Sequence, residues 1–158
     1  MKKIAILVFA TALTCVAFTS DKEAVYAPVF VTRTTLESSV IYLPQPQAMK
    51  NVGKVYYKAP YVYVNERYKG VHVINNTNPA APVVEGFIQV PGCIDMAVQS
   101  NIMYLDNAVD LVSFDLTTKM VTSRIKDVFP EPVPPGSYIY DYDNMRPEGY
   151  VLVEWKKQ

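Results

Sequence analysis

The chain holds a single histidine, His72, and this limits the acid–base and metal chemistry that the sequence can support. A Ser/His/Asp nucleophilic set or a histidine-containing metal cluster would have to use this one residue. His72 stands between Val71 and Val73 in the middle of an apolar run, where a packed side chain is the simpler interpretation. We therefore predict no catalytic residues, no metal site and no cofactor.

Carboxylate and amide side chains gather in one short stretch of the second half of the chain. They are Asp106, Asn107, Asp110 and Asp115. Such side chains could face a common rim and act on a substrate there. They are also the residues that end strands and hydrogen-bond the backbone of turns throughout β proteins. We predict structural roles for all four.

Tyrosine rings could stack on a sugar or a peptide, since the ring is apolar and its hydroxyl is polar. Five fall in one part of the sequence: Tyr56, Tyr57, Tyr61, Tyr63 and Tyr68. Tyr61 and Tyr63 share one face of a strand by simple alternation, so some of these rings must belong to the core. Tyr68, within the turn Glu66–Gly70, is predicted to lie on an exposed tip, and it is our predicted ligand-binding residue.

Residues 1–20 have the pattern of an export signal. Lys2 and Lys3 precede the apolar run Ile4–Val16, which is too short to cross a bilayer, and a polar break follows at Thr19. We expect an exported protein in the outer membrane or periplasm of a Gram-negative bacterium. The formal net charge is zero, and without a basic stripe nucleic acid is not an expected partner.

Two cysteines bear on how the chain is processed and stabilised. Ala12–Cys15 resembles a bacterial lipobox, which would make Cys15 a lipidated first residue and the lipid the only contact with a membrane. Small residues at Cys15 and Ala17 offer ordinary signal peptidase a rival cut. Only Cys93 then remains, so no internal disulfide is expected. Its apolar neighbours predict a buried, unreactive thiol.

Residues 52–130 read as two similar β units. Short runs of Val, Ile, Tyr and Phe alternate with Gly, Asn, Asp and Pro, without a helical period. Tyr61–Asn65 aligns with Ile102–Asp106, and Gly70–Asn75 aligns with Asp110–Asp115, in both cases about 40 residues apart. Four short strands in a unit of this length are typical of propeller blades. The predicted fold is all-β, with antiparallel blade-like repeats of an incomplete β-propeller.

The strands of each unit can be assigned from these runs and from the turn residues between them. The first unit is predicted to contain Lys54–Lys58, Tyr61–Asn65, Val71–Asn75 and Val83–Val90. The second is predicted to contain Ile94–Val98, Ile102–Asp106, Leu111–Asp115 and Met120–Ile125.

The segment Val71–Pro82 resembles the repeat of the LVIVD family. That repeat is an apolar strand, an acidic or amide residue, Ser or Thr, and then Asp or Asn, Pro, two small residues and Pro. Here Asn78 can open the turn, and Pro79 and Pro82 withhold donors from further pairing. The second unit keeps the strand Leu111–Asp115 but lacks both prolines. The resemblance covers roughly residues 50–130 and implies a bacterial surface β-propeller, without bringing any catalytic residue.

The regions on either side of the repeats complete the predicted organisation. Residues 21–51 lead into the repeats and include two β-prone stretches, Val29–Thr35 and Val40–Leu43. Residues 131–158 are predicted to be a Pro-rich linker followed by a terminal β hairpin of Tyr138–Tyr142 and Tyr150–Trp155. Two blades cannot close a propeller, which needs about four. The chain is therefore a truncated family member or an open β array whose uncovered faces predict self-association.

These features favour a noncatalytic interaction or scaffold protein of the cell envelope, with a protein or a carbohydrate as partner, because repeats present broad surfaces. Two alternatives stay open. One is an enzyme or carbohydrate-processing accessory whose site is completed by missing blades. The other is a truncated protein without independent function.

Overall fold

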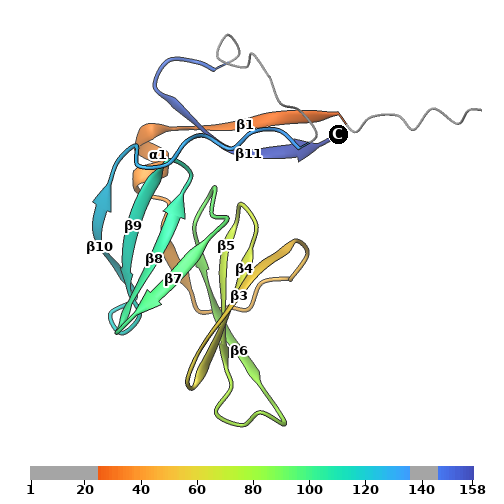
Figure 1. The fold of residues 1–158 in the computed structure, drawn as a ribbon, viewed down its shortest axis with the longest axis vertical. Coiled ribbons are helices and arrows are strands. Elements are labelled where there is room, and N and C mark those ends of the chain that lie inside the picture. Colours follow the sequence, from red (N-terminus) through yellow and green to blue (C-terminus); the bar gives the residue numbers. More distant parts are fainter. Residues whose placement is uncertain (1–24, 136–145) are drawn as a thin grey trace, which may run out of the picture.

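The structure, a computed structural model, describes residues 25–135 and 146–158 (Figure 1). The predicted export signal with Cys15 and the predicted strand Tyr138–Tyr142 lie outside the described residues. Apart from one short helix, the regular secondary structure described consists of strands in three antiparallel sheets, as the all-β prediction required.

The first predicted unit forms one sheet, which we call sheet 1. Its four strands follow one another antiparallel, and a short fifth strand from the segment before the repeats adds to the outer edge. Every predicted strand of this unit is present, with ends shifted by one or two residues. The strands in spatial order are β2 (Ile41–Leu43), β6 (Val83–Gln89), β5 (Gly70–Asn75), β4 (Tyr61–Glu66) and β3 (Val52–Lys58).

The second unit forms sheet 2 with the same order of strands. Its first strand begins two residues later than predicted, because the N–H groups of Ile94 and Asp95 are bound by the carboxylate of Asp106. The strands are β10 (Met120–Ile125), β9 (Asp110–Asp115), β8 (Ile102–Asn107) and β7 (Met96–Gln99).

The turn that ends β5 forms as its sequence predicts. The side chain of Asn75 accepts from the Thr77 N–H at 2.9 Å, and that of Asn78 accepts from the Ala80 N–H at 3.1 Å. In sheet 2 the side chain of Asp115 accepts from the Thr117 N–H at 2.7 Å. Both units therefore stop their third strand with a side-chain bond to the backbone two residues ahead.

A third, two-stranded sheet joins the two ends of the described chain. We call it the terminal sheet; it consists of β1 (Tyr26–Thr32) and β11 (Tyr150–Lys157), paired antiparallel. The sequence predicted that β11 would pair with a neighbouring strand in a terminal hairpin. In the structure β11 pairs with β1, from the segment before the repeats. Figure 1 shows the terminal sheet running across one end of sheets 1 and 2.

The β-prone stretch Val29–Thr35 is strand only in part. The chain leaves β1 at Thr32 and forms the one-turn helix α1 (Arg33–Glu37). Thr32 caps this helix, because its hydroxyl accepts from the Thr35 N–H at 3.1 Å. The prediction of β structure over residues 33–35 was therefore wrong.

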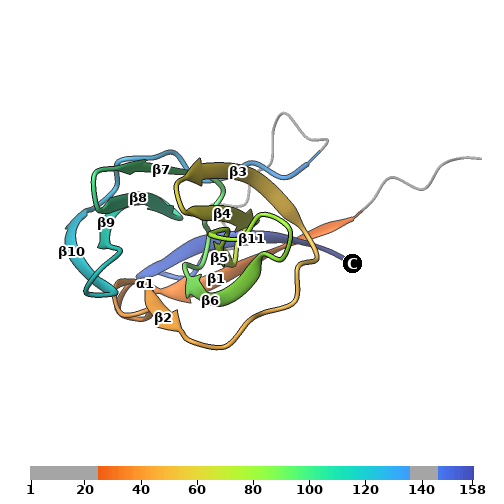
Figure 2. The same cartoon turned by 90° about the horizontal axis from the view of Figure 1, so that it is seen from below.

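Sheets 1 and 2 pack face to face around the main core. Seen along the strands in Figure 2, β3 and β7 lie side by side at one edge, where the Tyr56 hydroxyl donates to the Val98 carbonyl at 2.9 Å. A second, smaller core of Leu36, Ala108, Val109, Val151 and Val153 joins sheet 2 to the terminal sheet. The main core contains Tyr63, Val71, Val73 and Ile88 from sheet 1 and Met96, Met103, Leu105, Val112 and Phe114 from sheet 2.

Candidate functional site

Asp110 is the centre of a buried ion-pair cluster. Its carboxylate accepts from Arg33 and from Arg124, each at 2.7 Å, and from the Asp127 N–H at 3.1 Å. Burial alone would raise the pKa of Asp110, but the hydrogen bonds from Arg33, the Asp127 N–H and Arg124 outweigh it and hold the pKa below its usual value. The cluster ties α1 and the chain after β10 to sheet 2, so this carboxylate has the structural role predicted for it.

Asp106 and Glu66 have matching roles in the two units. Glu66 accepts from the N–H groups of Lys50 and Asn51 at 3.0 and 2.5 Å, just before β3. Asp106 accepts from the N–H groups of Ile94 and Asp95 at 3.0 and 2.9 Å, just before β7. A carboxylate at the end of the second strand thus fixes the start of the first strand in each unit.

The pKa values of the two carboxylates shift in opposite directions. Burial would raise the pKa of Glu66, but the backbone N–H bonds and His72 lower it overall. Burial raises the pKa of Asp106 overall, because it outweighs the two backbone N–H bonds. Glu66 and Asp106 therefore have the same structural role, but the folded protein favours the ionised form of Glu66 and disfavours that of Asp106.

His72 is fully buried, as its sequence context predicted. Its ring lies 4.8 Å from that of Phe87, and Nε2 is 3.3 Å from a carboxylate oxygen of Glu66. Nδ1 has no hydrogen-bond partner among the described residues. The side chain packs in sheet 1 and holds Glu66.

Cys93 is buried and is held by two contacts. Its sulfur lies 3.4 Å from the Asn65 amide nitrogen and 3.4 Å from the Asp95 carbonyl oxygen. Burial, followed by the nearby charge of Asp106, raises the pKa of the thiol well above its usual value. The predicted packing role is confirmed, and a thiol held neutral in this way is a poor nucleophile.

Tyr68 does not lie on an exposed tip, and that prediction was wrong. The residue adopts a positive φ of 64° in its turn, its side chain is half-buried, and burial raises its pKa. Its N–H donates to the Cys93 carbonyl at 2.7 Å and its carbonyl accepts from the Gly92 N–H at 3.0 Å. Neighbouring elements cover the turn, which the local sequence could not reveal. A role for Tyr68 in ligand binding stays a prediction.

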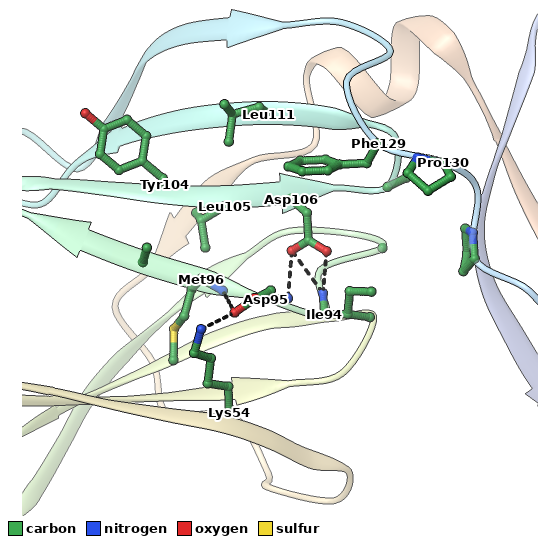
Figure 3. Close-up of a pocket in the computed structure, with 14 residues that line it drawn as sticks. Lys54, Ile94, Asp95, Met96, Tyr104, Leu105, Asp106, Leu111, Phe129 and Pro130 are labelled. Atoms are coloured by element: carbon green, nitrogen blue, oxygen red, sulfur yellow. Dashed lines mark hydrogen bonds and ion pairs between the residues drawn. The ribbon is translucent and has the colours of Figure 1, made fainter.

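The most apolar hollow described lies mainly on the face of sheet 2 that points away from sheet 1. We call it the sheet 2 hollow; its cavity volume is about 380 Å³. Figure 3 shows Phe129 and Pro130 at one end of it and Tyr104 at the other. Its lining includes Ile94, Ala97, Tyr104, Leu111, Phe129 and Pro132.

The charged groups at the rim of this hollow are already paired. Lys54 donates to Asp95 at 2.7 Å, and Asp95 also accepts from the Met96 N–H at 2.6 Å (Figure 3). Asp106 is occupied by the two N–H groups described above. The hollow therefore suits an apolar group better than a reacting polar substrate, because its carboxylates are committed to the fold.

The Pro-rich stretch closes one end of the sheet 2 hollow. The N–H groups of Val128 and Phe129 both donate to the Val109 carbonyl, at 2.8 and 2.9 Å. These bonds hold the segment against sheet 2, so Phe129 reaches the outer side of Leu111. Sequence reasoning ended the second unit at residue 130 and treated residues 131 onward as a linker, so it missed the part that Phe129, Pro130 and Pro132 have in a hollow. Alternation in β8 and β9, which puts Tyr104 and Leu111 on one face, was the available signal.

In comparisons with known proteins, no family model, curated protein or solved structure matches this chain. Residues 25–135 and 146–158 contain no group of three His, Cys, Asp or Glu side chains placed to hold a metal ion. No helix in this part of the chain is long and apolar enough to span a membrane.

Proposed function

We propose that the protein is a noncatalytic interaction or scaffold module of a bacterial cell envelope, and that it binds a protein partner at the sheet 2 hollow. The observation that carries this proposal is the hollow itself, an apolar and aromatic depression on an outer sheet face. Apolar, aromatic patches of this kind are typical of protein contact sites.

We also propose that sheets 1 and 2 are two blades of an incomplete β-propeller and that the signal at residues 1–20 exports the chain. Support comes from the repeat of about 40 residues, from the LVIVD-like segment Val71–Pro82 and from the first strands β3 and β7 lying together at one edge. A blade normally has a neighbour on each face, and such a neighbour would cover the sheet 2 hollow.

The side chains that line the sheet 2 hollow indicate which kind of ligand it would bind. Tyr104, Leu111 and Phe129 offer rings and branched carbons, and Lys54 and Asp95 neutralise each other at the rim. An apolar side chain of a protein partner fits these surfaces, whereas a carbohydrate would need free polar groups beside the rings.

A photo-crosslinking amino acid at position 104 tests the proposal in the producing cell. Position 150 on the terminal sheet is the matched control, since Tyr150 is also a partly exposed tyrosine (39 % exposed). We expect a covalent adduct with protein from position 104, in the envelope fraction, and little from position 150. Equal adducts from the two positions, no adduct from position 104 or recovery from the cytosol would contradict the proposal.

A further inference from the structure

Each of the two stacked sheets has one covered face and one outer face. Alternation puts Tyr63, Val71 and Val73 of sheet 1 toward sheet 2, where they join the main core. The intervening residues Val62 and Ile74 therefore point to the outer face of sheet 1. In sheet 2 the residues that face the core are Met103, Leu105, Val112 and Phe114, and those that point outward include Tyr104, Leu111 and Ile125.

The repeat makes each outer face equivalent to a face that is buried in the core. By alignment, Val62 corresponds to Met103, and Ile74 corresponds to Phe114. The outer face of sheet 1 is thus equivalent to the face by which sheet 2 meets sheet 1. Conversely, Tyr104 corresponds to Tyr63 and Leu111 to Val71, so the outer face of sheet 2 is equivalent to the face by which sheet 1 meets sheet 2. The two outer faces are therefore related to each other by position in the repeat as the two inner faces are.

Both outer faces expose apolar side chains. On sheet 1 the row Tyr57, Val62, Ile74 and Val84 runs across four paired strands, and Tyr57 is 63 % exposed. On sheet 2 Ile125, which is 57 % exposed, lies opposite Leu111 in the half near the terminal sheet, and Met120, which is 64 % exposed, lies opposite Asp115 at the far end.

Part of each outer face is covered by the chain itself. Residues 44–51 pass over sheet 1 on the side away from sheet 2 (Figure 2), and Lys50 and Asn51 are fixed there by Glu66. Phe129 and Pro130 cover the end of the sheet 2 hollow. The parts of the two outer faces that stay uncovered are therefore the available contact surface.

We propose that the occupant of these faces is a second copy of the chain, packed head to tail: the outer face of sheet 2 of one copy lies on the outer face of sheet 1 of the next. The contact repeats the packing of sheet 1 on sheet 2 inside the chain. A contact between two different faces continues from copy to copy, and it closes into a ring if the rotation allows. With two sheets a copy, roughly two to four copies would give the four to eight blades of known propellers. This inference rests on the proposed function and names the partner.

Sedimentation velocity on the full chain and on two single-face variants tests the proposal. Tyr57→Asp blocks the outer face of sheet 1, and Ile125→Asp blocks that of sheet 2. We expect the wild type to associate as concentration rises and each variant alone to associate at least tenfold more weakly. An equimolar mixture of the two variants should form a dimer, because each supplies the face that the other lacks.

Val25→Asp is the matched control, since Val25 is 65 % exposed, directly precedes β1 and belongs to neither face; it should associate like wild type. If circular dichroism shows that a variant has lost its β structure, Val55→Asp or Ala97→Asp, on the same two faces, replaces it. A monomeric wild type, or a mixture that stays monomeric, would overturn head-to-tail packing. A monomer that still crosslinks to a different protein from position 104 would leave the proposed function standing while this inference fails.

Discussion

The turn between the second and third strands differs between sheets 1 and 2. In sheet 1 it spans residues 67–69, and Tyr68 binds the backbone of Gly92 and Cys93 in the connection between the sheets. In sheet 2 it has two residues, Ala108 and Val109, which pack under the terminal sheet. One turn thus holds the two sheets together, and the other anchors them to the ends of the described chain. The two units share their strands, whereas the turns between these strands differ in length and in the part of the molecule that they contact.

Equivalent side chains also differ in burial between the two sheets. Phe114 of sheet 2 is fully buried between the sheets, whereas Ile74, its equivalent in sheet 1, is only half-buried on an outer face. The position in the repeat therefore predicts the face of the sheet on which a side chain lies. Its burial, and so its contribution to the free energy of unfolding, depends on whether another sheet covers that face.

Truncation at this pair of positions should give the largest effect. Phe114→Ala removes a fully buried ring and should lower the free energy of unfolding by about 4 kcal/mol. Ile74→Ala should cost about 1 kcal/mol, because much of that side chain is in water already. Urea unfolding at a concentration that keeps the chain monomeric measures both. Equal losses of unfolding free energy in the two variants would mean that the two faces are equally buried and would contradict the difference described above.

The ion-pair cluster around Asp110 belongs to sheet 2 and has no equivalent carboxylate in sheet 1. Asp110 begins β9, and its equivalent at the start of β5 is Gly70. Asp110→Asn leaves Arg33 and Arg124 without their shared carboxylate and should cost about 3 kcal/mol. The exposed pair of Lys54 and Asp95 is the control, since Lys54→Met should cost under about 1 kcal/mol. Thermal or urea unfolding of both variants decides the point, and a small loss for Asp110→Asn would show that water replaces the carboxylate.

The matching carboxylates Glu66 and Asp106 should respond to pH with opposite sign. The pKa of Glu66 is lowered by folding, so its contribution is present above the unfolded value of about 4.3 and is lost as the pH falls through the folded value. Glu66→Gln should therefore cost about 1 kcal/mol at pH 7, and the cost should shrink toward pH 3.

The pKa of Asp106 is raised by folding, so lowering the pH toward about 3.9 stabilises the wild type relative to Asp106→Asn. The difference between these two proteins should grow from pH 7 to pH 4. Unfolding curves across that range measure both signs. Two variants that change in the same direction would contradict the assigned environments.

Much of the fold follows from local sequence patterns. The eight strands of the repeats, the turn at Asn78 and the packed His72 and Cys93 all follow from alternation, turn chemistry and the period of about 40 residues. Each of these features depends on residues close together in the sequence or on similarity between the two units.

The features that sequence reasoning missed depend on contacts between distant segments. The pairing of β1 with β11 and the bond from Arg33 to Asp110 join residues whose neighbours carry no shared pattern. Tyr68 was placed in the correct turn, but the segments that cover it come from other parts of the chain. The helix at Arg33–Glu37 was missed because threonine favours strands, and here Thr32, the last residue of β1, instead caps the helix that follows.

The smallest expected effect concerns how each unit ends its third strand. In sheet 1 the Asn78 side chain binds the Ala80 N–H in an exposed turn, whereas in sheet 2 the side chain of Asp115 binds the N–H groups of Thr117 and Thr118. Asn78→Ala should therefore lower the free energy of unfolding by about 0.5–1 kcal/mol, because one side-chain bond is lost and water can replace it. Thr118→Ala, the control in sheet 2, keeps the N–H that Asp115 binds and removes only the weaker contact of the Thr118 hydroxyl with Asp115, so it should change stability less. Paired urea titrations can resolve this difference, and a larger loss for Thr118→Ala would show that the two units end their third strands by different means.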